Sequence, residues 1–256
     1  MSRKIFASAA ILALTIAEAA VAPAANADHP WNDYHWARTA NPFTLKLGDN
    51  VTPVWDSYLQ TTSTDWTAST VLNTTIVPGS TTPKKCTATV GMVQICNAAY
   101  GQRGWLGIAS INISGPHITQ GTVKVNDTYF DTAKYNTPAW RNVVMCQEVG
   151  HTLGLGHQDE IFTNPDLNTC MDYSNDPAPN QHPNQHDYDQ LVSIYSHLDA
   201  TTTIGAAAPA SSGGEVGNSE GSWGTLVEGS RGRGTSTYVK DLANGQKAIT
   251  HVIWAN

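Results

Sequence analysis

The stretch that decides the fold is CQEVGHTLGLGH, which runs from Cys146 to His157. Positions 147 and 151 are four residues apart, so in a helix their side chains lie on one face, with Cβ atoms about 5–6 Å apart. Gly154 can adopt a positive φ angle, which ends the helix and turns the chain back towards the same point. We therefore expect Gln147, His151 and His157 to surround one metal ion.

Glu148 lies one step further round this helix, beside the expected ion, where a carboxylate can take a proton from metal-bound water. Three protein ligands and an open fourth position are typical of catalytic rather than structural zinc sites. The expected cofactor is therefore one Zn²⁺ ion, and the expected role of Glu148 is that of a general base. A lone Glu-x-x-His occurs often by chance, so the prediction depends on the whole pattern as far as His157.

This block resembles the zinc signature of the metzincin proteases, His-Glu-x-x-His-x-x-Gly-x-x-His, and Thr152–His157 is especially similar to the matrixins. Further on, the sequence from Cys170 to Tyr173 resembles the methionine-containing turn of that clan. The resemblance implies a zinc-dependent endopeptidase that acts on proteins or peptides, with Tyr173 supporting the transition state near the metal. It covers about residues 43–198 and is strongest after Gly121.

The main departure from the metzincin pattern is Gln147, which stands where the clan has its first histidine. Glutamine offers a neutral amide oxygen, a weaker donor for zinc than an imidazole nitrogen. A loss of about 3 kcal/mol from a zinc-binding free energy of roughly 10–16 kcal/mol weakens such a site without emptying it. The alternative function is a catalytically inactive binding or adhesion protein on a protease fold, and the intact Glu148 argues against it.

A second departure concerns latency, since matrixins are usually held inactive by a cysteine in a prodomain. No cysteine precedes the first expected strand, so this form of control is not expected.

The hydrophobic pattern predicts an α+β fold. The order of the expected elements indicates a mixed sheet, followed by a small C-terminal β-hairpin extension. The resemblance implies a metzincin-like catalytic domain with a mixed, mostly parallel twisted sheet, a central active-site helix and a C-terminal helix. Thr137 is expected to cap the central helix before Pro138, and the helix is expected to be buried and to end at Gly154. The expected strands are Phe43–Leu47, Val71–Val77, Cys86–Cys96 (or a tight hairpin), Trp105–Ile113 and Gly121–Phe130. The other expected helices are Val54–Trp66 and His186–Leu198. Trp105–Ile113 is either the edge strand that pairs with extended substrate, as it does in matrixins, or a strand whose apolar residues fill the core.

Four segments are expected along the chain. Residues 1–27 have the features of a secretory signal peptide, with Arg3 and Lys4 before an apolar run. Residues 28–200 form the catalytic domain, and residues 201–222, mostly small and polar, predict a flexible linker. Residues 223–256 carry a hairpin signal around Asn244 and Gly245, and such a hairpin should dock on another element. The protein is therefore expected to be secreted.

The charge and composition of the chain indicate which classes of binding partner to expect. The 256 residues carry a formal charge of −7, and the 14 Lys and Arg residues are scattered, so neither nucleic acid nor a membrane is an expected partner. Four cysteines in an exported chain favour two disulfides. Of the three connectivities, Cys86–Cys96 with Cys146–Cys170 closes short loops, and free buried thiols are the alternative.

Other polar residues carry weaker signals. A structural Ca²⁺ site is not supported, because the acidic residues between Asp159 and Asp172 lack the regular spacing of a calcium loop. His182 and His186 fit either a second metal site or, as we favour, a solvated loop. His117, beside a proline, also fits either a metal ligand or a loop residue. Asp187 is expected to anchor the methionine turn by analogy with matrixins.

Overall fold

The computed structural model describes residues 28–205 and 216–255. The expected signal peptide, residues 1–27, lies outside the described residues, as do residues 206–215 of the expected linker. Among the described residues, no helix is both long enough and apolar enough to cross a membrane.

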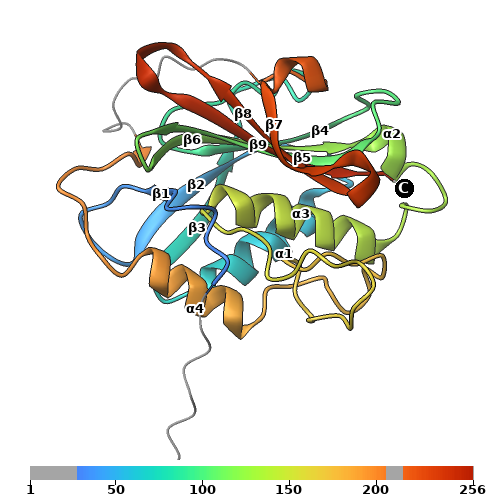
Figure 1. Cartoon of the computed structure of the whole chain (residues 1–256), viewed down its shortest axis with the longest axis horizontal. Helices are drawn as coiled ribbons and strands as arrows, with labels where there is room; N and C mark the ends of the chain where they lie inside the picture. Colours follow the sequence, from blue (N-terminus) through green and yellow to red (C-terminus); the bar gives the residue numbers. More distant parts are fainter. Residues whose placement is uncertain (1–27, 206–215, 256) are drawn as a thin grey trace, which may run out of the picture.

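One mixed sheet of nine strands forms the centre of the molecule, and helices α1, α3 and α4 lie on the same side of it (Figure 1). The strand order is β3-β2-β4-β6-β5-β9-β8-β7, and the short β1 also pairs with β6. The strands are β1 His35–Trp36, β2 Phe43–Asn50, β3 Leu72–Pro78, β4 Val93–Ala98, β5 Trp105–Ser114, β6 His117–Asn126, β7 Thr225–Ser230, β8 Thr235–Asp241 and β9 Lys247–Trp254.

The first half of this sheet is mostly parallel, as predicted. Strands β1, β2, β3, β4 and β6 pair in parallel, whereas β5 runs antiparallel to β6. Helix α1 (Asp56–Thr67) packs between β3 and α3. Buried aliphatic side chains such as Leu45, Val93 and Val123 fill the space between sheet and helices. The α+β class with a mixed sheet is therefore confirmed.

The central helix, α3, runs from Pro138 to Thr152 and is buried on nearly all sides. Its N-cap is Thr137, whose side chain accepts a hydrogen bond from the Trp140 amide at 3.2 Å. The last helix of this region, α4 (Gln185–Ile194), begins with a capping box at Asn184 and ends before the predicted Leu198.

Two predicted strands were partly wrong. Only Val93–Ala98 of the region around Cys86–Cys96 is a strand, because residues 86–92 form a loop and turns. Strand β6 ends at Asn126, and residues 127–130 form the short helix α2 (Asp127–Phe130). The Asn126 side chain accepts a hydrogen bond from the Thr128 amide and so caps this helix.

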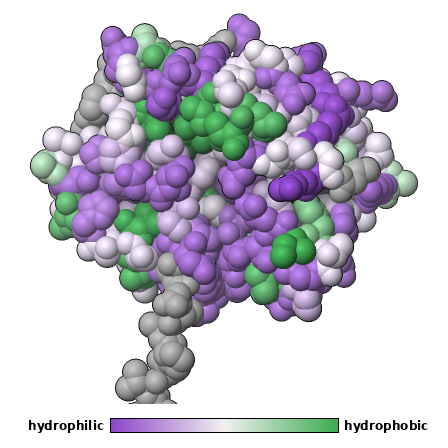
Figure 2. All heavy atoms as spheres, in the orientation of Figure 1, coloured by the Kyte–Doolittle hydropathy of each residue, from purple (hydrophilic) through white to green (hydrophobic). Residues whose placement is uncertain are grey.

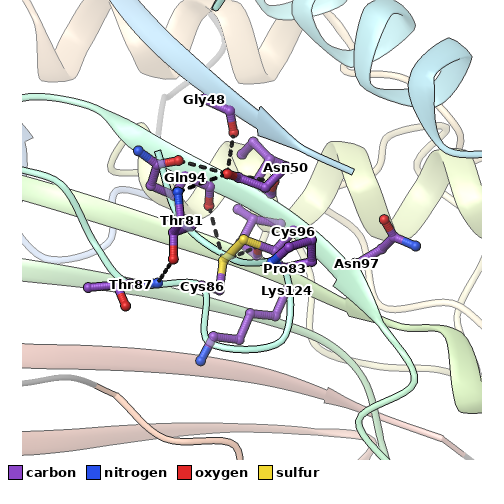
Figure 3. Close-up of a disulfide and its surroundings, with 12 residues drawn as sticks. Gly48, Asn50, Thr81, Pro83, Cys86, Thr87, Gln94, Cys96, Asn97 and Lys124 are labelled. Atoms are coloured by element: carbon purple, nitrogen blue, oxygen red, sulfur yellow. Dashed lines mark hydrogen bonds between the residues drawn. A yellow bond between two sulfur atoms is a disulfide. The ribbon is translucent and has the colours of Figure 1, made fainter. Parts of the chain in front are cut away.

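Both favoured disulfides are present. Cys86–Cys96 joins the loop after β3 to strand β4, and Asn50 donates hydrogen bonds to Gly48 O and Gln94 Oε1 beside it (Figure 3). Cys146–Cys170 joins α3 to the methionine turn. Two disulfides fit a protein of an oxidising compartment.

The C-terminal region continues the main sheet. The predicted hairpin around residues 244–245 is β8 and β9, and β7 adds a third antiparallel strand. Strand β9 pairs with β5 over eight register positions. A second cluster of buried residues includes Trp105 of β5 together with Trp223 and Trp254. This cluster provides the docking that an isolated hairpin needs.

Large hydrophobic side chains remain exposed on β7, where Leu226 and Val227 are 45% and 58% accessible. Figure 2 shows a hydrophobic area on the face that lies over strands β7 to β9.

The ends of the expected linker are attached to the main domain. The amides of Thr203 and Gly205 donate hydrogen bonds to Ala37 O at 3.0 Å and Gly91 O at 2.8 Å. On the other side of residues 206–215, Lys124 Nζ donates to the Val216 carbonyl oxygen at 2.9 Å.

Candidate metal centre and active site

The C-terminal half of helix α3 places Glu148 and His151 in the interior. The two side chains are 0% and 1% exposed. Strand β5 passes directly over Glu148, since a Cβ atom at Gly107 would lie only 2.6 Å from Glu148 Oε1. The absence of a side chain at Gly107 therefore allows the sheet and the helix to approach closely at the site.

The turn after α3 brings His157 back to His151. Gly154 adopts a φ of +95°, a conformation that favours glycine. Its carbonyl oxygen accepts a hydrogen bond at 2.7 Å from the Trp31 amide, so the N-terminal segment holds the turn in place. The ring centroids of His151 and His157 are 4.6 Å apart.

A third histidine, which the sequence analysis did not identify, joins this pair. His251 lies on β9 and is 1% exposed. Its ring centroid is 4.0 Å from that of His151 and 4.8 Å from that of His157. One ring nitrogen from each of the three lies within 4.8 Å of the others, a small side-chain movement from the about 3.3 Å implied by tetrahedral Zn–N bonds.

The ring nitrogens of the three histidines fall into two groups. Each Nδ1 atom faces an oxygen: His151 Nδ1 lies 2.8 Å from Leu155 O, His251 Nδ1 lies 3.4 Å from Glu148 Oε2, and His157 Nδ1 lies 4.0 Å from Glu160 Oε1. All three Nε2 atoms are buried and have no hydrogen-bond partner. Buried polar atoms are normally paired, so three unpaired Nε2 atoms in one cluster fit a metal site.

Burial keeps these imidazoles neutral. Desolvation lowers the pKa of His151 and of His251 to about 3, and it lowers the pKa of His157 well below its usual value. It also raises the pKa of Glu148 to about 8. Neutral imidazole is the form that binds zinc, and a bound cation would favour the carboxylate form of Glu148.

Gln147 has different surroundings from the three histidines. Its Nε2 donates a hydrogen bond to Cys170 O at 2.8 Å, and its Oε1 is buried without a partner. It lines a small cavity with Tyr173, whereas the three histidines line another cavity of about 250 Å³. Of the three predicted ligands, His151 and His157 line the larger cavity. Gln147 lines the smaller one, and its unpaired Oε1 could still bind a metal ion.

The methionine turn lies directly under helix α3. A Cβ atom at Gly150 would lie 2.6 Å from Met171 Sδ, so helix and turn are in close contact. The turn is anchored as predicted, because the buried Asp187 carboxylate accepts a hydrogen bond from the Thr169 hydroxyl.

Tyr173, which follows this turn, lies beside the histidine cluster. Its ring centroid is 4.1 Å from that of His157. Desolvation raises the pKa of the Tyr173 hydroxyl, so the group stays protonated, and the Thr235 side chain of β8 lies close enough to lower that pKa in part. The ring of Tyr173 thus lies directly against that of the predicted ligand His157.

Strand β5 is not an open edge. Nine of its ten residues are buried, and Ser114 is the exception. Strand β9 pairs with β5 along almost its whole length. The C-terminal strands also approach two predicted catalytic residues, since His251 faces Glu148 and Thr235 lies beside Tyr173.

The sequence contained no local signal for His251. It lies in the apolar run Ile249–Trp254, where a single histidine is ordinarily a core residue. Its role depends on a strand pairing between segments that are about 140 residues apart in the chain, which sequence spacing does not indicate. Among the histidines whose role the sequence left open, His182 pairs with Asp65 at 2.7 Å.

Comparisons with known proteins give a distant structural likeness. No protein-family model matches the sequence, and no curated protein sequence matches it. Among solved structures, the chain is similar to high choriolytic enzyme 1, a hatching enzyme zinc-protease from the medaka fish Oryzias latipes. The two chains share 8% identity with a TM-score of 0.35, and the match covers 63% of this chain and 94% of that one. These values are too low to assign a family or an activity to this protein.

Proposed function

We propose that this chain is a secreted zinc-dependent peptidase whose own C-terminal strand holds it in a latent arrangement. The observation that carries the proposal is the group of three buried imidazoles with unpaired Nε2 atoms beside the buried Glu148. The sequence pattern from Cys146 to His157 and the methionine turn, which resemble the metzincin signature, support a peptidase rather than another zinc hydrolase.

In the arrangement described here, His151, His157 and His251 are the proposed zinc ligands. A zinc ion held by these residues would polarise a scissile carbonyl and lower the pKa of a water molecule. Once β9 has left β5, Glu148 would accept the proton of the attacking water and pass it to the leaving amine. The Tyr173 hydroxyl donates a hydrogen bond to the developing oxyanion.

Latency follows from the position of β9. An extended peptide that binds by β-augmentation needs the free edge of β5, and β9 occupies that edge. When β9 leaves, His251 leaves the metal and Glu148 loses its imidazole neighbour. Gln147, one helical turn before His151, is then the proposed third ligand through its amide oxygen.

Zinc analysis combined with a proteolysis assay tests this function. The purified protein should contain zinc by elemental analysis and should cleave casein slowly, and a chelator should abolish the cleavage. The matched control is Glu148→Gln, which removes the base and keeps the size of the side chain. This variant should bind zinc and show no cleavage. Equal cleavage by wild type and Glu148→Gln would overturn the proposed mechanism.

One observation favours a second function, that of a non-catalytic binding protein with a structural zinc ion. His251 Nδ1 lies 3.4 Å from Glu148 Oε2, and a carboxylate in that position orients a metal-bound histidine rather than a water molecule. Under this reading the protein binds zinc and never cleaves casein, even when β9 is displaced. Zinc content without chelator-sensitive cleavage would therefore select this function.

A further inference from the structure

A second group of metal-binding side chains lies away from the site described above. His35 is in β1, His117 begins β6, and His197 and Asp199 follow α4. Figure 1 shows that β1, the start of β6 and the end of α4 lie at the same end of the molecule. None of these four residues contributes to the cluster around Glu148.

The donor atoms of the group converge on Asp199 Oδ1. This oxygen lies 3.2 Å from His117 Nε2, 3.5 Å from His35 Nε2 and 3.8 Å from His197 Nε2. The Nε2 atoms of His35 and His197 are 3.2 Å apart. Zinc bonds of about 2.0–2.1 Å in a tetrahedron place neighbouring donors about 3.3 Å apart, close to these four separations. The donors of His35, His117 and Asp199 all lie within 4.8 Å of one another. His197 lies outside that group of three, so its exposed ring would have to turn to complete the set.

The remaining polar atoms of the buried His35 and the half-buried Asp199 are already bonded, which fixes the direction of their donors. His35 Nδ1 lies 2.6 Å from the Asp33 carbonyl oxygen, so the Nδ1 proton is donated there and Nε2 presents its lone pair to the group. Asp199 Oδ2 accepts hydrogen bonds from Arg38, at 3.1 Å from its amide and 2.9 Å from Nη1. Such partners orient metal ligands in proteins.

We propose that His35, His117, His197 and Asp199 form a second zinc site. Four protein donors without an open position are typical of a structural rather than a catalytic ion. His117 and His197 have side chains that are 34% and 51% exposed, so a cation can enter from solvent and these two rings can adjust around it.

The position of the site indicates what a bound ion would hold together. His35 belongs to the N-terminal segment, in which Trp31 packs against His151 with ring centroids 5.4 Å apart. Asp199 lies just after the last helix of the main domain, next to the segment that leads to the C-terminal strands. A zinc ion at this point joins both segments to β6.

Counting zinc ions in the full-length secreted protein tests the proposal. The wild type should bind about two zinc ions per chain, and His117→Ala combined with His197→Ala should bind about one. The two residues are partly exposed, so the double variant should still fold. The matched control is His182→Ala, which removes an exposed histidine outside both groups and should keep about two ions.

Cobalt substitution gives a second readout. Co²⁺ in the wild type should show visible absorption from two tetrahedral sites, and the double variant should lose one component. A wild type that binds a single ion, kept by the double variant and lost in His157→Ala, would overturn the second site and leave the first intact. An ion lost only in the double variant would instead overturn the first site. Two ions retained by the double variant would also refute the proposal.

Discussion

Replacing His251 with alanine should weaken zinc binding far more than replacing Gln147. His251 lies in the buried group whose Nε2 atoms are unpaired, whereas Gln147 already donates a hydrogen bond to Cys170 O and lines a different cavity. The chain therefore offers two rival third ligands, one from the C-terminal strand and one from helix α3, and their variants separate them.

The magnitude follows from the number of donors. A zinc-binding free energy of roughly 10–16 kcal/mol, divided evenly over four coordination positions, gives about 2.5–4 kcal/mol for each. Loss of the His251 imidazole should therefore weaken zinc binding by about 70-fold to about 900-fold. For Gln147→Ala, which removes no ligand in this arrangement, we expect less than about 5-fold.

Competition with a chromophoric chelator measures both affinities at constant pH. Since the second zinc group contributes its own ion, the comparison is made in the His117→Ala, His197→Ala background. Circular dichroism should show that both variants keep the wild-type fold. A 100-fold loss in Gln147→Ala with an unchanged affinity in His251→Ala would refute the reasoning and would support the ligand set that the sequence alone suggests.

Three further changes have defined outcomes. Ser110→Cys with Thr250→Cys should lock β9 on β5, because the two hydroxyl oxygens are 3.0 Å apart across the strand pair. Casein cleavage should be absent until mild reduction, and cleavage by the oxidised variant at the wild-type rate would contradict latency. The double substitution Cys146→Ser, Cys170→Ser removes the disulfide that closes a loop of about 25 residues and should lower the free energy of unfolding by about 3.5 kcal/mol in urea titrations. A loss under 1 kcal/mol would show that this disulfide does not stabilise the fold. Thr137→Ala removes the cap of α3 and should cost about 1 kcal/mol in the same assay, with Thr132→Ala, outside the helix, as a near-neutral control.

Local chemistry explains why much of the fold was predictable. The N-cap at Thr137, the proline after it and Gly154 at the end mark helix α3, and the structure places the helix between them. The pairing of four cysteines was predicted from loop length alone and is confirmed. These features depend on residues that are close together in the chain, where spacing determines geometry.

The parts that the sequence did not indicate depend on distant pairings. The third strand of the C-terminal region, β7, alternates weakly and was not predicted. The position of β9 beside β5 is set by side chains such as Trp105, Trp223 and Trp254, which meet only after the chain has folded. His251 reaches His151 through that pairing, and therefore no motif at position 251 could reveal it.

Zinc binding and the position of β9 should be coupled, because the proposed ligand His251 can reach the ion only while β9 lies on β5. The closed arrangement is the one in which β9 lies on β5. If zinc binds this arrangement more tightly than the open one, the ion stabilises it by the difference between the two binding free energies. Linkage requires that opening weakens zinc binding by the corresponding factor. With the loss estimated for His251, saturating zinc should raise the free energy of opening by up to about 2.5–4 kcal/mol. Amide hydrogen exchange in Lys247–Trp254 reports this opening directly, and His251→Ala is the matched control in which zinc should no longer slow it. Exchange in β9 that zinc leaves unchanged, while the amides of α3 become protected, would show that the ion is held by the helix and its turn alone, and latency would then rest on strand pairing without the metal.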